Sequence, residues 1–317
     1  MKKINLNKWV WFGMLTCGCL DLDLLDDMHP SDGGALDETG APSTTSSSKD
    51  GDGPPLPEAD PSDEVAPRIM AAACGEPERA ENNVCLIDGP VSAAARFSTD
   101  EPAEVSLSDE MVGLSEAWST EHLVIFKLDT EETSTRLEVS DINGNTATVQ
   151  LVLRRNDDRS PVVITEIHAD PFGAEPAQEY IEIKNVGSAP VDLSGWMIDD
   201  NGDRNGDLIS TGTELGADEI ALIVSESYDP LSETDPQPDP GARMIRLEGS
   251  LVSNGLKNSL AESVELYDAD GRLASRFDGS IGLGSEGESL HRRHELVPPL
   301  APNAFGIIKP ATPGKSP

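Results

Sequence analysis

The sequence predicts an all-β protein in which two small β-sandwiches follow a disordered N-terminal tether. Short runs rich in Val and Ile, separated by Pro, Gly and Asn, recur through residues 69–317 and are typical of sandwich strands. Beyond the first twelve residues the only indoles are Trp118 and Trp196, one in each half of this region, which favours two small cores. A polar stretch without Phe, Trp or Tyr precedes both halves.

The strongest strand signal lies between residues 161 and 200. Its three runs are residues 161–171, 179–185 and 191–200. In the second run, alternation with a period of two places Ile181 and Ile183 on one face and Tyr180, Glu182 and Lys184 on the other. We therefore expect strands with one apolar and one polar face, and a core that includes Trp196.

These runs carry the motifs E-I-H-x-D-P, E-Y-I-E-I-x-N and L-S-G-W, and in this order they resemble the lamin tail domain of bacterial proteins. The later E-S-L-H-R-R strand and the terminal A-T-P-G are also similar to that family. The resemblance implies an immunoglobulin-like β-sandwich over residues 159–317. It implies a fold and no particular chemistry, because one fold supports many functions.

Residues 69–158 are expected to form a separate domain. The elements S-T-D-E-P-A, T-E-H and D-x-x-G-N, in this order, resemble a fibronectin type III-like module of bacterial exported proteins. The Gly-Leu-x-Pro turn and the strand tyrosine of such modules are missing around residues 127–135. Asn143 and Gly144 predict a tight turn between two strands. The resemblance implies a second immunoglobulin-like domain that acts as a spacer or platform.

Residues 1–19 are typical of an export signal, with a Lys-bearing start and an apolar run that is too short to cross a bilayer. The run ends in L-T-C-G-C, which resembles a bacterial lipoprotein processing site. Gly18 favours Cys19 as the lipidated residue, although Thr16 stands where Leu is usual. Lipidation of Cys17, or an ordinary cleaved signal with incidental cysteines, are the alternatives.

The stretch from residue 20 to residue 68 is rich in Asp, Ser, Thr, Gly and Pro. Such a composition cannot bury enough apolar surface to offset its chain entropy, so we expect a disordered acidic linker. Its Asp residues repel one another and extend it. The expected role is a tether between a membrane anchor and the folded domains.

The formal net charge of the chain is −35, and it would be near −38 once the three lysines of the signal are removed. Non-specific binding to nucleic acid needs Lys and Arg to neutralise phosphates. We therefore expect no nucleic-acid partner. The expected partners are a membrane, through the lipid anchor, and a protein, surface or matrix component. The expected location is the cell envelope, at the outer membrane or cell surface.

Cys74 and Cys85 are the two thiols that would be left after processing and lipidation. In an exported, oxidising setting we expect them to form a disulfide. A metal site is the alternative, which two cysteines without a nearby His disfavour.

An acidic loop at residues 199–207 is a candidate calcium site. Oxygen-bearing side chains alternate along it, as in calcium loops, and they are Asp199, Asn201, Asp203, Asn205 and Asp207. Counted from Asn201, the twelfth position is Gly212 instead of a bidentate Glu, so the loop is not an EF-hand. A plain acidic connection between strands is the leading interpretation, so we expect no cofactor. Calcium bound by this loop is the alternative.

Glu166, His168 and Asp170 alternate along one strand and therefore share a face. No Ser or Cys lies in a recognisable nucleophile elbow, and an alternating polar face is ordinary for a strand exposed on one side. His291 and His294 are expected on opposite faces, and His122 is expected to be structural. We expect no catalytic residues and no enzymatic activity.

The sequence thus supports a non-enzymatic lipoprotein of the cell envelope that serves as an adhesion, scaffold or binding module. One alternative is a calcium-dependent binding module that uses the 199–207 loop. Another is an accessory component of an exported hydrolase, since lamin-tail-like domains also occur attached to such enzymes.

Overall fold

The computed structural model describes residues 57–315, except residues 72, 201, 253, 258–261, 280 and 303. Within these residues the secondary structure consists of β-strands, and no helix is present that could cross a membrane. The protein is therefore all-β, as the sequence predicts. The predicted export signal with Cys19, and residues 20–56 of the predicted linker, lie outside the described residues.

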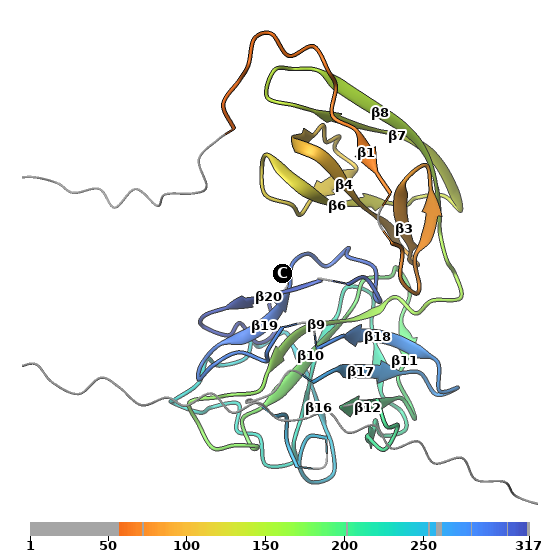
Figure 1. Cartoon of the computed structure of the whole chain (residues 1–317). Coiled ribbons are helices and arrows are strands. Elements are labelled where there is room, and N and C mark those ends of the chain that lie inside the picture. The colour runs from red at the N-terminus through yellow and green to blue at the C-terminus, as the bar shows by residue number, and fades with distance from the viewer. Residues whose placement is uncertain are drawn as a thin grey trace, which may run out of the picture. The chain divides into compact units, whose positions relative to one another are not determined.

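Strands β1 to β8 form one connected, antiparallel sheet system (Figure 1). They are β1 (Ile69–Met70), β2 (Arg79–Glu81), β3 (Val84–Asp88), β4 (Ser92–Val105), β5 (Met111–Gly113), β6 (Ser119–Lys127), β7 (Glu132–Ser140) and β8 (Thr146–Arg154). Five strands follow the order β2-β3-β4-β6-β5, while β1 pairs with β4 and β7 pairs with both β4 and β8. The turn between β7 and β8 contains Gly144 with a φ of 87°, at the predicted position.

Strand β4 belongs to two layers because its register shifts between Ser98 and Ala103. Its first part pairs with β6, and its end at Glu104 and Val105 pairs with β7. An irregularity of this kind lets one strand pass from one sheet to another. The two layers enclose a core that includes Phe97, Phe126, Leu137, Val139, Leu151 and Leu153.

Strands β9 to β20 form the second half. They are β9 (Val162–His168), β10 (Tyr180–Asn185), β11 (Val191–Asp192), β12 (Met197–Asp200), β13 (Asp207–Leu208), β14 (Glu214–Leu215), β15 (Ile220–Val224), β16 (Arg243–Arg246), β17 (Val264–Tyr267), β18 (Leu273–Phe277), β19 (Ser289–Arg292) and β20 (Phe305–Ile308). One sheet has the order β16-β15-β10-β9-β19-β20, a second has the order β13-β12-β17-β18, and β11 pairs with β14.

The core of this half lies on the face that alternation marks as apolar. Ile181 and Ile183 from β10 pack in one buried cluster with Ile198 from β12 and Leu266 from β17. Trp196 is 5% exposed and belongs to the same cluster, which confirms its predicted place in the core. Burial of apolar side chains between two layers is what holds such a sandwich together.

The hydrophobic core of the second half continues into the first. Ile87, Ala94, Leu123 and Ile125, on the face of the first sheet that points away from its own sandwich, belong to the buried cluster of the second half. The Ser92 hydroxyl also donates a 2.5 Å hydrogen bond to the Leu296 carbonyl. The first sheet is therefore buried on both faces, which explains its nearly continuous apolar runs.

Candidate functional sites

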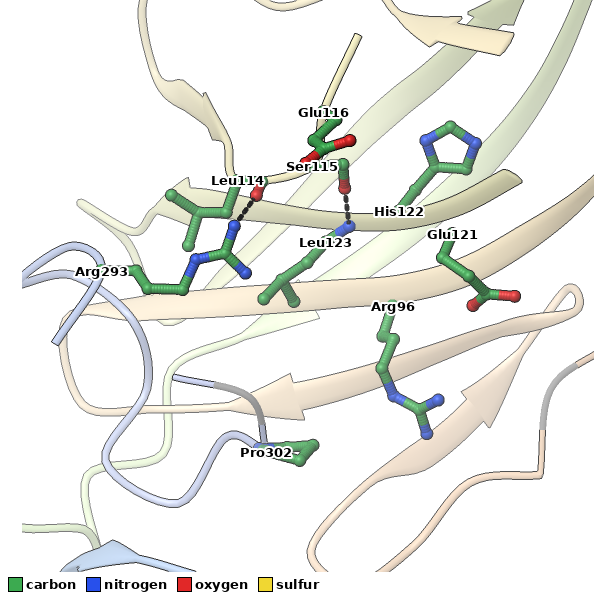
Figure 2. A pocket seen from close by; sticks show the side chains of 9 residues that line it. All are labelled: Arg96, Leu114, Ser115, Glu116, Glu121, His122, Leu123, Arg293 and Pro302. Atoms are coloured by element: carbon green, nitrogen blue, oxygen red, sulfur yellow. Dashed lines mark hydrogen bonds between the residues drawn. The ribbon is translucent and has the colours of Figure 1, made fainter. Parts of the chain in front are cut away.

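A pocket of about 300 Å³ lies between strand β6 and the segment that joins β19 to β20 (Figure 2). It is lined by Arg96, Leu114, Ser115, Glu116, Glu121, His122, Leu123, Arg293 and Pro302. The Ser115 hydroxyl accepts a 2.7 Å hydrogen bond from the Leu123 N–H, and the Arg293 guanidinium donates to the Leu114 carbonyl. These bonds fix the loop at one side of the pocket.

Both arginines of the pocket are engaged by other groups. Arg96 donates two hydrogen bonds of 2.7 and 2.8 Å to the Glu78 carboxylate and a third to the Ala73 carbonyl. A bidentate pair of this kind is strong and directional. The guanidinium groups of Arg96 and Arg293 are therefore held in place by neighbouring protein groups.

His122 contributes to the pocket wall but its ring lies on the other face of β6, away from Arg96 (Figure 2). The ring stacks on Phe97 at 4.8 Å, and Nε2 lies 3.1 Å from the Thr99 hydroxyl. Burial lowers its pKa. These contacts are those of a packed core histidine.

The face of β9 and β10 that alternation marks as polar is buried, although we expected it to be exposed. Glu166 is fully buried there, and its Oε1 accepts hydrogen bonds from the hydroxyls of Tyr180 (2.7 Å) and Ser289 (2.6 Å). Thr312 donates to the same carboxylate through its backbone N–H at 2.8 Å and its hydroxyl at 3.0 Å. The C-terminal segment thus covers this face and satisfies the buried charge.

Glu182 lies opposite Glu166 on the neighbouring strand and is also fully buried. Its carboxylate accepts hydrogen bonds from the Thr165 hydroxyl at 2.5 Å and from the Gly314 N–H at 2.7 Å. Burial, opposed by the bond from Thr165 and reinforced by the charge of Glu166, raises its pKa to about 8. The buried group therefore favours its protonated form at neutral pH.

The structure brings Glu166 and His168 onto one face, as alternation requires, and buries both side chains. His168 Nδ1 bonds the Glu288 carbonyl at 2.9 Å, and burial lowers the pKa of the ring. The hydroxyls of Tyr180 and Ser289 both bond Glu166. This cluster therefore holds the sheet to the C-terminal segment.

Four of the five residues of the predicted calcium loop are described, and they differ in burial and in the face of the sheet on which they lie. Asp199 is 1% exposed, whereas Asp203 and Asn205 are exposed and bond each other through the Asn205 N–H. Asp207 is paired with Ile198, so it lies on the other face of the sheet from Asp199. Asn201 lies outside the described residues. The calcium assignment stays a prediction, and its residues do not form one ring of ligands.

Cys74 and Cys85 form a disulfide, with their Cα atoms 5.4 Å apart. The two sulfur atoms are therefore bonded to each other. A further group of carboxylates, from Asp63, Glu101 and Asp141, has oxygens within 4.8 Å of one another. Asp63 belongs to the end of the predicted linker and accepts a hydrogen bond from the Asn143 amide at 3.2 Å.

Residues 155–279 match the Lamin Tail Domain model. No curated protein and no solved structure matches the chain. The family confirms the predicted resemblance for these residues, and its domains are immunoglobulin-like and generally non-catalytic.

The lamin tail match ends before strands β19 and β20, which complete the six-stranded sheet, since β19 pairs with β9 and β20 pairs with β19. Sequence reasoning missed Arg292 on β19, which is fully buried. A signal for it existed, because alternation places Arg292 on the same face as Leu290. It also missed Glu265 on β17, 7% exposed, since nothing near it in the sequence points to a partner.

Proposed function

We propose that the protein is a non-enzymatic lipoprotein of the cell envelope that presents its β-domains as an adhesion, scaffold or binding module. The lamin tail match carries this proposal, since residues 155–279 are similar to a family of immunoglobulin-like, generally non-catalytic domains. The lipoprotein-type signal ending at Cys19 and the acidic linker support the anchored location.

Two surface depressions support a binding role. One is the pocket around Arg96 and Arg293, and the other, of about 600 Å³, lies beside residues 155–161 and 186–191. The buried carboxylates Glu166 and Glu182 already accept hydrogen bonds from the C-terminal segment. We therefore expect partner contacts on these outer surfaces and on loops.

The anchor is tested by fractionation of cells that make the wild type, Cys19→Ser or Cys17→Ser. We expect Cys19→Ser alone to release the protein from membranes, and globomycin to accumulate the precursor. Release by Cys17→Ser alone would contradict the assignment of Cys19, and release by neither variant would contradict the lipid anchor.

The binding role is tested by capture of surface or matrix components with a fragment that begins at Pro57, so that the contact between Asp63 and Asn143 is kept. We expect specific capture and no hydrolase turnover in broad screens. Turnover that disappears in His168→Ala would favour the enzyme reading instead.

A calcium-dependent form of this module is the second candidate. It is favoured by Asp199, whose buried Oδ1 has no hydrogen-bond partner. A buried carboxylate oxygen without a partner is costly unless a cation binds it.

A further inference from the structure

Two carboxylates face each other across adjacent strands of the four-stranded sheet. Asp199 on β12 is directly opposite Glu265 on β17. In an antiparallel pair such residues lie on the same face, with Cβ atoms roughly 4.5–5.5 Å apart. Their neighbours Ile198, Val264 and Leu266 belong to the core, so Asp199 and Glu265 lie on the outer face. An outer face would ordinarily leave both carboxylates in water.

The loop after β12 removes them from water. Asp199 is 1% exposed and Glu265 is 7% exposed. The Arg204 N–H donates a 2.9 Å hydrogen bond to Asp199 Oδ2, which folds the loop back over the strand. Gly202 has a φ of 67°, and a Cβ there would lie 2.8 Å from Glu265 Oε2. The loop therefore closes over both carboxylates at short range.

The hydrogen bonds that the described residues donate to this pair come from neutral groups. Asp199 Oδ1 is buried and has no hydrogen-bond partner, while Glu265 Oε2 accepts a hydrogen bond from the Tyr267 hydroxyl at 3.0 Å. The guanidinium of Arg204 lies over the Tyr267 ring, 5.1 Å from its centroid. Among the described residues no ion pair joins a basic side chain to Asp199 or Glu265. Like charges directly opposite each other destabilise a sheet.

We propose that a divalent cation of the calcium type binds between Asp199 and Glu265, with Asp199 Oδ1 and the Glu265 carboxylate as its charged ligands. Calcium prefers oxygen ligands and tolerates irregular geometry, so water and loop carbonyls complete its shell. This inference rests on the calcium-dependent candidate function and changes its ligands. Glu265 is included, and the exposed Asp203 and Asn205 are left out.

Calorimetric titration of the full-length chain with calcium chloride, after treatment with a chelator, tests the site. Extracellular calcium modules bind with dissociation constants of about 0.1–1 mM, and we expect this range. Asp199→Asn and Glu265→Gln should each weaken binding at least about tenfold, as loss of one charged ligand in a low-dielectric site implies. Asp203→Asn is the matched control, because it removes the same charge from the same loop, and it should bind like the wild type.

Thermal unfolding in chelator shows whether the variants remain folded. Each variant removes one of two negative charges that face each other. We therefore expect a melting temperature equal to or above that of the wild type, with no rise on addition of calcium. If Asp199→Asn or Glu265→Gln unfolds the protein, terbium luminescence of the wild type and of Tyr267→Phe decides whether the ion binds at this site. Tyr267 donates to Glu265, so its excitation should sensitise a terbium ion bound there, and the conservative Tyr267→Phe should remove most of that emission.

The outcomes separate this proposal from the function on which it rests. Calcium binding that is lost in Asp203→Asn but kept in Glu265→Gln would place the ion in the linear loop and overturn the proposal, while the calcium-dependent function stands. Terbium emission unchanged by Tyr267→Phe would also overturn it. No binding of calcium to the wild type at about 10 mM, far above the expected range, would contradict both.

Discussion

The backbone N–H of Gly314 donates a 2.7 Å hydrogen bond to the carboxylate of Glu182, which lies 132 residues earlier in the chain. Beside it, Thr312 bonds Glu166 through two hydrogen bonds. The C-terminal segment therefore closes the outer face of strands β9 and β10 over two carboxylates. The stability of this covered face consequently depends on whether Glu182 is ionised.

The raised pKa of Glu182 predicts that stability falls with rising pH. Its carboxyl group titrates at about 8 in the folded state, against 4.5 for a free Glu. Between these values the folded chain holds a proton that the unfolded chain has released, so the free energy of unfolding decreases as pH rises. We expect Glu182→Gln to raise the free energy of unfolding at pH 8 by roughly 1–4 kcal/mol and to change it little at pH 4.

Urea unfolding of both proteins at pH 4, 6 and 8 measures this. Glu179, whose pKa burial also raises to about 8, should leave part of the pH dependence in the variant. The exposed Glu214→Gln is the control and should leave the slope unchanged. A Glu182→Gln variant that is less stable than the wild type at pH 8 would show that the ionised carboxylate is the favoured form.

Replacement of Arg292 should destabilise the protein strongly. Its fully buried guanidinium donates to the Ile164 carbonyl at 2.6 Å and to the Val297 carbonyl at 3.2 Å, and lies over the Phe305 ring at 4.8 Å. Arg292→Ala would leave these carbonyls buried without donors and open a cavity. We expect a loss of about 3–5 kcal/mol in the free energy of unfolding, measured in urea.

The adjacent Arg293→Ala is the matched control. Arg293 is exposed and donates to a single carbonyl, that of Leu114. It should cost about 1 kcal/mol or less. Equal losses from the two replacements would mean that burial of Arg292 contributes nothing to stability.

The disulfide between Cys74 and Cys85 should stabilise the first half. It closes a loop with a sequence separation of 11. In the chain-entropy model such a loop is worth about 3 kcal/mol, because the bond restricts the unfolded chain. We expect the Cys74→Ser, Cys85→Ser double variant to lose roughly that amount. Intact mass before and after alkylation of the exported protein checks the pairing, and two freely alkylated thiols would refute it.

The shared core predicts that the two halves unfold together. Ile125 from β6 is fully buried in the cluster that also contains Ile164 and Ile181. We expect Ile125→Ala to cost about 2–4 kcal/mol and to shift the whole protein's unfolding as one transition. Emission from Trp118 reports on the first half, and emission from Trp196 on the second, in variants that retain one indole.

The exposed Leu208→Ala should change stability by about 0.5 kcal/mol or less. Two separate transitions, of which Ile125→Ala shifts only the one reported by Trp118 emission, would show that the halves are independent domains joined by residues 156–160.

The sequence by itself determined where many strands lie and which side chains form the central core. Period-two alternation correctly assigned Ile181 and Ile183 to an inward face, and the size of the Trp196 indole correctly placed it in the core. These features are local, because a strand's backbone fixes the direction of every second side chain without reference to the rest of the chain.

Only the tertiary structure decided what covers the other faces. Glu182 is buried because Gly314 and its neighbours lie over it, and Ile125 is buried because the second half packs against the first. Asp199 meets Glu265 because β12 and β17 pair in one particular register. Alternation gives each strand two faces, but the partner of a face is set by contacts between distant segments, which no local pattern encodes.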